Sequence, residues 1–181
     1  MTISELDVQN ALKTLIDPNT DSDFISSKSA KNIQVNGSDV ALDVELGYPA
    51  NSQIEPIRSS VTAAISAIPG AGKVSANVFS RIVAHSVQRG VKLMPNVRNI
   101  IAVASGKGGV GKSTTAANLA LALAAEGAKV GLLDADIYGP SQPMMMGVSG
   151  KPESHDGKTM EPLESHGVQI ASIGFMIDPD Q

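Results

Sequence analysis

Hydrophobic residues recur three and four positions apart in two stretches of the first 85 residues, which is the spacing of amphipathic helices. Thr2 and Glu5 have the spacing of a capping box, so the first helix is predicted to begin there and to end before Pro18. The second helix is predicted over 57–68, where a Pro-Gly pair stops it. The polar stretch 19–31 is predicted to be a loop.

Alternating apolar and polar residues predict three strands in the same part of the chain. Val35 precedes the turn pair Asn36-Gly37, and every second residue of 40–46 is apolar, which together predict a β-hairpin. A third strand is predicted over 74–78. The order helix, strand, strand, helix, strand is typical of a small α+β domain, which is assigned to residues 1–85.

A second domain is predicted over 99–181, after a linker at 86–98 that lacks any hydrophobic period. Its predicted elements are strand 99–104, helix 113–126, strand 129–133, a polar loop at 147–166 and a last strand at 168–173. A strand, a helix and a strand in this order predict a parallel unit, and the fold class is α/β. Because a doubly wound sheet needs more strands than these, the chain is expected to be the N-terminal portion of a longer protein; the alternative is a complete minimal domain.

Composition limits the partners and the chemistry that these domains can have. The net charge is −4 and neither half carries a basic stripe, so nucleic-acid binding is not expected. The first residues lack the pattern of a signal peptide, and no apolar run approaches the ~20 residues that span a bilayer. No membrane partner and a cytoplasmic location are therefore expected. Cysteine is absent, which excludes disulfides and thiolate-held metals or clusters within these residues.

Residues 106–113 read Gly-Lys-Gly-Gly-Val-Gly-Lys-Ser and fit the phosphate-binding loop (P-loop) pattern G-x-x-x-x-G-K-[ST]. Glycines let backbone N–H groups wrap a phosphate, and the following helix adds the positive end of its dipole. Lys112 is predicted to reach the β- and γ-phosphates of ATP, and the Ser113 hydroxyl to ligate Mg²⁺. The alternative is a glycine-rich turn between two core elements. The predicted nucleotide-binding residues are Gly106, Lys107, Gly108, Gly109, Val110, Gly111, Lys112, Ser113 and Thr114.

Two aspartates, Asp134 and Asp136, directly follow the predicted strand 129–133. Ligands of open α/β sheets bind beyond the carboxyl ends of the strands, so both carboxylates are expected beside the phosphates. Carboxylates in that place hold the hydration shell of Mg²⁺ or orient the attacking water. The alternative is that the Asp-x-Asp sequence only caps a turn after the strand.

Two other groups of residues carry a weaker signal. The run Met144 to Met146 fits either a soft docking surface or ordinary packing, and packing is favoured. The three histidines, His85, His155 and His166, lack the spacing of a metal site and are interpreted as surface or hydrogen-bonded residues.

Three stretches together resemble one family. They are SGKGGVGKS at 105–113, LLDADIYGPSQP at 132–143 and HGVQIASIGF at 166–175, and they are similar to the Mrp/ApbC group of deviant-Walker ATPases, the iron–sulfur cluster carriers. Residues 1–85 resemble the small α/β domain that many bacterial members carry ahead of the ATPase. The stretch that begins at Asp134 is not shared by the septum-positioning and chromosome-partitioning relatives.

The resemblance implies a homodimer that hydrolyses ATP, carries a [4Fe–4S] cluster between its subunits and delivers it to apoproteins. It implies that Lys107 crosses the dimer interface to the partner's nucleotide, that Asp136 positions water and that Asp134 lies near the Mg²⁺. Lys107, Lys112 and Asp136 are therefore the expected catalytic residues. The sequence departs from the family where the family holds its cluster with a Cys-x-x-Cys pair, because cysteine is absent. It also has Asn19 where relatives usually have Glu, in the sequence Asp-Pro-Glu.

Two other functions remain open. A partitioning or positioning ATPase with the same dimerisation switch is expected to show a basic surface or a terminal amphipathic membrane helix, and neither is visible. A non-enzymatic module, in which nucleotide binding only gates docking, also fits the P-loop. In every case these 181 residues alone are expected to hydrolyse ATP weakly or not at all.

Overall fold

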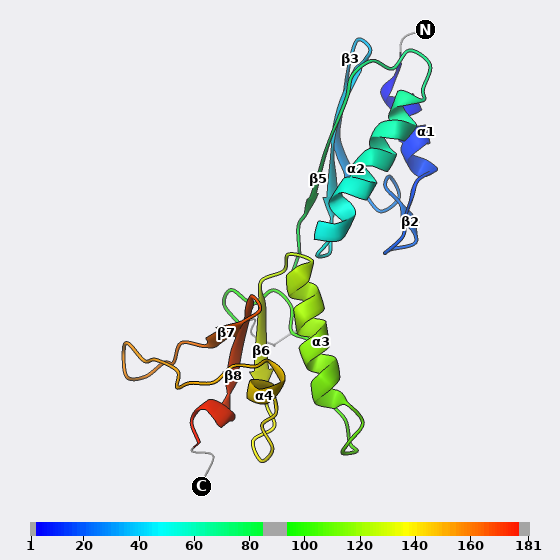
Figure 1. Cartoon of the computed structure of the whole chain (residues 1–181). Coiled ribbons are helices and arrows are strands. Elements are labelled where there is room, and N and C mark those ends of the chain that lie inside the picture. Colours follow the sequence, from blue (N-terminus) through cyan, green and yellow to red (C-terminus); the bar gives the residue numbers. More distant parts are fainter. Residues whose placement is uncertain (1–2, 85–93, 178–181) are drawn as a thin grey trace. The chain divides into compact units, whose positions relative to one another are not determined.

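The computed structural model describes residues 3–84 and 94–177 (Figure 1). The chain divides into two compact units, Met1–Asn99 and Ile100–Gln181. Each unit has a sheet and a hydrophobic core of its own. Most of the predicted linker 86–98 lies outside the described residues, so its bounds and those of the two domains stay predictions.

The first unit is a three-stranded sheet packed against two helices. Its elements are α1 (Glu5–Lys13), β1 (Ile16–Asp17), β2 (Ser22–Asp23), β3 (Ala30–Asn36), β4 (Asp39–Leu46), α2 (Asn51–Ser66) and β5 (Val74–Ser80). The central strand β4 pairs antiparallel with β3 through the predicted hairpin, and parallel with β5 after the crossover through α2. Figure 1 shows both helices on one face of the sheet. This arrangement confirms the predicted small α+β fold.

Helix α1 begins later than the capping box predicted at Thr2 and Glu5, so that prediction is wrong. The N-cap is Ser4, whose hydroxyl accepts a hydrogen bond from the Asp7 N–H at 3.3 Å. The Asp7 carboxylate in turn accepts one from the Ser4 N–H at 3.0 Å. A serine and an aspartate thus close the box two residues further along than the pair that the sequence offered first.

Two further predictions for this unit need correction. Helix α2 starts at Asn51 rather than at residue 57. The prediction missed residues 51–56 because they carry little hydrophobic period and include Pro56. The predicted loop 19–31 contains β2 and the first residues of β3. Strand β2 pairs antiparallel with β1. Each of these strands is two residues long, which is too short to leave a pattern in the sequence.

The core of the first unit lies between β4 and the two helices. Alternate residues of β4 are buried as the pattern of 40–46 predicted, and residues spaced along α1 and α2 meet them. The fully or almost fully buried members are Val8, Leu12, Val40, Leu42, Val44, Leu46, Ile57, Val61 and Ile65. Because β4 is buried on one face only, its apolar and polar residues alternate, and this alternation was enough to predict the strand.

The second unit is a smaller layer of strands covered by two helices. Its elements are α3 (Lys112–Ala125), β6 (Val130–Asp134), α4 (Gln142–Met145), β7 (Leu163–Ser165), β8 (Val168–Ser172) and the 3-10 helix η1 (Ile173–Phe175). The strand order is β6-β8-β7; β6 and β8 are parallel, and β7 and β8 are antiparallel. The mixed α/β class is confirmed, and the predicted helix and the strands at 130–134 and 168–172 form within one residue of their expected bounds.

Three details of this unit differ from the prediction. Residues 99–104 form no strand, and Ile100 and Ile101 are 73% and 61% exposed, because no strand in the described part of the chain pairs with them. The sheet is mixed rather than purely parallel. The last residues of the predicted loop 147–166 form β7, since His166 and Gly167 both have positive φ and close a tight hairpin onto β8.

Candidate nucleotide-binding site

The glycine loop at 106–111 leads directly into helix α3. Gly109 and Gly111 have φ of 73° and 87°, a left-handed conformation that favours glycine, and Gly111 is the N-cap of α3. The loop residues are exposed, and no atom lies within 4 Å of the place where a Cβ would stand at either glycine. Backbone conformation, rather than crowding, is therefore what requires glycine here.

The first turn of α3 provides free N–H donors beside this loop. Lys112, Ser113 and Thr114 form that turn, which has no acidic residue and no side-chain cap. Unpaired N–H groups and the positive end of the helix dipole attract phosphate. Lys112 and Ser113 are half-buried, whereas Thr114 and every loop residue from Gly106 to Gly111 are exposed. An open, uncapped helix terminus of this kind fits an anionic ligand.

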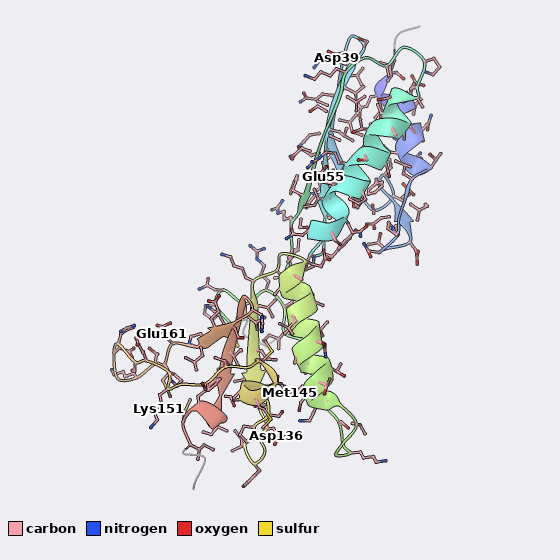
Figure 2. All side chains as sticks on the ribbon, viewed as in Figure 1. Asp39, Glu55, Asp136, Met145, Lys151 and Glu161 are labelled. Carbon is pink, nitrogen blue, oxygen red and sulfur yellow. The ribbon has the colours of Figure 1, made fainter. Side chains whose placement is uncertain are left out.

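Lys112 and Asp136 meet, as expected for a lysine at the start of α3 and an aspartate beyond β6. The Lys112 Nζ lies 3.2 Å from Oδ2 of Asp136, and both side chains are partly exposed. Oδ1 of Asp136 accepts a hydrogen bond from the Gly139 N–H at 3.2 Å. Figure 2 shows Asp136 in the loop at the end of β6. One carboxylate oxygen therefore fixes this loop while the other faces the P-loop lysine.

Asp134 is buried and serves as an acceptor for several protein groups. Its side chain is 7% exposed, and Oδ2 accepts hydrogen bonds from the N–H groups of Ser141 and Gln142 at 3.0 and 3.1 Å. The Ser172 hydroxyl donates to the same oxygen at 3.1 Å, and the Asp136 N–H donates to Oδ1 at 3.2 Å. This carboxylate thus joins the end of β6, the start of α4 and the end of β8. An indirect role near Mg²⁺ stays a prediction.

Gln142 is a part of this site that the sequence prediction missed. Its side chain is 4% exposed, and its Nε2 donates a hydrogen bond to the Ser113 carbonyl oxygen at 3.2 Å. The amide oxygen, Oε1, has no hydrogen-bond partner among the described residues. A glutamine between Ser141 and Pro143 has no motif that would reveal this contact, because it joins residues 29 positions apart.

The other predicted residues lie at the edge of the site or away from it. Lys107 is exposed, and its backbone N–H and carbonyl both bond to the Ser105 hydroxyl, at 3.1 and 2.9 Å. Val110 is 55% exposed. The methionine run is divided, since Met146 is 1% exposed and Met144 is 88% exposed. His155 and His166 are exposed, as interpreted from the sequence, and His85 lies outside the described residues.

The donor set fits a nucleotide-bound cation better than a protein-held one. Among residues 3–84 and 94–177, no three His, Cys, Asp or Glu side chains come together as a metal site. Asp134 already accepts four hydrogen bonds and Asp136 faces Lys112. Mg²⁺ usually keeps several waters and takes few protein ligands plus substrate phosphates. Ser113 as a Mg²⁺ ligand stays a prediction, and this mode of binding is compatible with it.

Comparison with known proteins gives the family. A family model described as NUBPL iron-transfer P-loop NTPase matches residues 96–181, and a model of an iron–sulfur cluster assembly protein matches residues 5–78. The iron–sulfur cluster carrier protein of Synechocystis is 39% identical over 178 residues, which are 96% of this chain and 50% of that protein. Residues 96–181 belong to this family of iron-transfer P-loop NTPases, and residues 5–78 to the iron–sulfur cluster assembly family.

Two other relatives are similar to most of this chain and to a smaller share of their own length. The Escherichia coli K12 iron–sulfur cluster carrier protein is 49% identical over 148 residues, covering 78% of this chain and 39% of that protein. The Arabidopsis thaliana chloroplastic Fe-S cluster assembly factor HCF101 is 38% identical over 184 residues, covering 95% and 33%. The chain thus spans about half the length, or less, of the curated relatives that it matches.

Two further findings are narrower. A solved domain of unknown function, DUF59, from Bacillus anthracis covers 41% of this chain and 73% of its own, with 17% identity and a TM-score of 0.39, a likeness too low to carry an argument. Within the described residues, no helix has both the length and the apolar character needed to cross a bilayer.

Proposed function

We propose that this chain is the nucleotide-binding part of an ATP-dependent iron–sulfur cluster carrier. The observation that carries the proposal is the open P-loop at the start of α3, with Lys112 facing Asp136 from the end of β6. Membership of a P-loop NTPase family supports the coarse activity. We propose four features beyond this: the nucleotide is ATP, the protein hydrolyses it, it acts as a homodimer, and it works in the cytoplasm.

The residues of the P-loop would bind ATP through charge and backbone donors. The N–H groups from Gly106 to Ser113 face the phosphates, and the Lys112 ammonium neutralises the charge of the β- and γ-phosphates. Ser113 contributes its hydroxyl to the Mg²⁺ shell, and Mg²⁺ supplies further neutralisation of phosphate charge when it is bound. Lys112 exchanges its present partner, Asp136, for the phosphates, which frees that carboxylate.

Asp136 is the proposed group that orients the attacking water. Its Oδ1 is already held by the Gly139 N–H, so the side chain keeps its place when Oδ2 loses the lysine. A carboxylate held in this way positions a water for in-line attack on the terminal phosphate. Lys107, exposed at the rim of the loop, is proposed to complete the site of a partner subunit.

The iron–sulfur cluster is cargo in this proposal and apo iron–sulfur proteins are its recipients. Clusters of the [4Fe–4S] type are held by cysteine thiolates, and these 181 residues contain none. No step of cluster binding is therefore derived from them. The relatives' printed name, iron–sulfur cluster carrier protein, supports the cargo.

Nucleotide binding is tested with a fluorescent ATP analogue and the chain in which Lys112 is replaced by alanine. Loss of a charged phosphate contact is expected to weaken binding at least about tenfold. The matched control is Lys129→Ala, which removes an exposed lysine just before β6 and is expected to leave the affinity unchanged. Equal affinity of wild type and Lys112→Ala would overturn the proposed role of the loop.

Dimerisation and cargo need separate measurements. Sedimentation with and without ATP tests the homodimer, and Lys107→Ala is expected to impair hydrolysis more than binding. Cluster delivery is tested in the protein as it occurs in the cell, by reconstitution with iron and sulfide and transfer to an apoprotein. ATP-dependent association without any uptake of iron and sulfide would favour a positioning-type ATPase or a nucleotide-gated module instead.

A further inference from the structure

Gln142 links the two elements that carry the predicted Mg²⁺-binding residues. It is the first residue of α4, and its backbone N–H donates to the Asp134 carboxylate at 3.1 Å. Its side-chain Nε2 donates to the carbonyl oxygen of Ser113 at 3.2 Å. One buried residue thus connects the end of β6 to the first turn of α3, where the Ser113 hydroxyl is presented.

The orientation of the Gln142 amide is set by its surroundings. The Ser113 carbonyl can only accept a hydrogen bond, so the amide must turn its nitrogen toward it and its oxygen away. That oxygen is buried and has no partner in the part of the chain that the structure describes. Buried amide oxygens are paired in the large majority of cases, so this one is left with the capacity to accept a hydrogen bond from a bound ligand or its waters.

We propose that Gln142 is a positioning residue for the cation that accompanies the nucleotide. Its Nε2 holds the Ser113 turn against the Asp134 end of β6, and its Oε1 accepts a hydrogen bond from a water molecule of the Mg²⁺ shell. The inference rests on the proposed function, since it concerns the same nucleotide site. It assigns a role to a residue that neither the P-loop pattern nor the Asp-x-Asp sequence includes.

A purely structural role for Gln142 would give a different result. If the side chain only joined α4 to α3, its loss would weaken nucleotide binding to the same extent with and without Mg²⁺. If it positions the cation, its loss reduces the gain in affinity that Mg²⁺ provides and leaves the binding of free nucleotide alone. The ratio of the two affinities therefore separates the two roles.

The test measures binding of a fluorescent ATP analogue to the 181-residue chain in Mg²⁺ and in EDTA. Gln142→Met keeps the length of the side chain and removes both amide groups; we expect it to lower the Mg²⁺-dependent gain in affinity about fivefold, a typical coupling for neighbouring groups. Affinity in EDTA should stay that of wild type. An unchanged gain, or an equal loss in both conditions, overturns the inference.

Two further variants make the result decisive. In the Ser113→Ala background, Gln142→Met is expected to have no additional effect on the Mg²⁺-dependent gain, because both residues act on the same cation; independent, additive losses would contradict this. The matched control is Gln169→Met, which changes an exposed glutamine of β8. Where Gln142→Met does not fold, as judged by circular dichroism, Gln142→Asn is measured by the same criteria, since its shorter amide cannot reach Ser113.

The outcomes also separate a failure of the role of Gln142 from a failure of the proposed nucleotide-binding function. A wild-type chain that binds no nucleotide in either condition overturns the proposed function, and the inference with it. A wild-type chain that binds tightly with Mg²⁺, beside a Gln142→Met chain that does the same, overturns the role of Gln142 alone.

Discussion

The two compact units of this chain differ in the residues on the open face of the sheet, which is the face that no helix covers. In the first unit, β4 buries one set of alternate residues under the helices and turns Asp43 and Glu45 to the other face. In the second unit, β6 places Leu132 on its covered face and Leu133 on the other, where the leucine is 74% exposed. The open face of β4 is polar, whereas β6 exposes a leucine on its open face.

The open face of the first sheet is made of cross-strand polar pairs. The Asp43 carboxylate accepts hydrogen bonds from the side-chain amides of Asn32 on β3 and Asn77 on β5, at 2.7 and 2.9 Å. These bonds hold the pKa of Asp43 below its usual value. Glu45 forms ion pairs with Lys31 at 2.9 Å and Arg81 at 3.4 Å. Such a face is stable in water without any further layer.

The open surface of the second unit has no comparable set of polar pairs among the described residues. Leu133, Ile100 and Ile101 are each more than half exposed. Runs such as 99–104 are continuously apolar, which is the pattern of strands buried on both faces, whereas β4 alternates. The difference teaches that the first sheet has a polar, hydrogen-bonded open face, whereas the second unit leaves single apolar side chains such as Leu133 exposed.

The largest predicted effect is the difference in folding stability lost when a buried leucine of the first sheet and an exposed leucine of the second are each replaced by alanine. Leu46 is 0% exposed in the core of the first unit, so Leu46→Ala is expected to destabilise that unit by about 3 kcal/mol through lost burial and the cavity left behind. Leu133→Ala is expected to change stability by less than about 0.5 kcal/mol, because the side chain is mostly in water.

Urea denaturation followed by circular dichroism measures both variants against wild type. A cost for Leu133→Ala as large as that for Leu46→Ala would show that the apolar face of β6 is covered in solution, and would remove the contrast between the two units. Leu6→Ala, at a 62% exposed leucine of α1, is the control for an exposed leucine in the first unit.

Local patterns in the sequence predicted much of the fold and of the site. The hairpin and the P-loop ahead of α3 each depend on residues that are neighbours in the chain; both form, although the hairpin turns at Gly37-Ser38, one residue after the expected pair. The meeting of Lys112 with Asp136 follows from one general rule, that ligands and their residues gather at the carboxyl ends of strands. The catalytic roles of these residues stay predictions.

What the sequence could not predict depends on partners distant in the chain. An apolar run such as 99–104 becomes a strand only beside another strand, and the described residues provide none. Gln142 reaches Ser113 from 29 positions away, and the four donors around Asp134 come from three different elements or loops. The N-cap is Ser4 rather than the expected Thr2, because a hydroxyl residue stands at both positions and spacing alone does not decide between them.

Each unit contains a buried carboxylate, and the one in the first unit predicts a dependence on alkaline pH. Asp17 is 3% exposed, and its two oxygens each lie 2.8 Å from the Tyr48 hydroxyl, which donates to it. Burial, and then the bond to Asp17, raise the pKa of Tyr48 to about 12, against the opposing effect of the hydrogen bond from Asn19. The folded state therefore keeps a proton that the unfolded state loses near pH 10.

The expected result is a loss of stability as the pH rises from 10 toward 12. Tyr48→Phe is expected to cost about 1–2 kcal/mol at neutral pH, because the buried carboxylate loses its hydroxyl donor, and to remove this part of the alkaline loss. Urea midpoints across that pH range measure both effects. Tyr138→Phe, at a fully exposed tyrosine of the second unit, is the control; if it removed the same alkaline loss, the assignment to Tyr48 would fail.

The smallest predicted effect concerns the charged pairs on the open face of the first sheet. The hydrogen bond from Lys31, together with the charges of Lys31 and Arg81, lowers the pKa of Glu45. A lowered carboxylate pKa contributes stability that is present above the unfolded value and is lost as the pH falls through the folded value. Glu45→Gln is therefore expected to lower the urea midpoint slightly at neutral pH and to match wild type well below pH 4.5.

Glu164→Gln, in the sheet of the second unit, is the matched control for Glu45→Gln in the first. Glu164 lies on the exposed face of β7 and joins no ion pair within the described residues, so its neutralisation should leave the midpoint unchanged at every pH. High salt should narrow the difference between wild type and Glu45→Gln, because it screens exposed charges. A Glu45→Gln difference that persists in acid or in high salt would mean that packing, rather than charge, makes the open face of the first sheet stable in water.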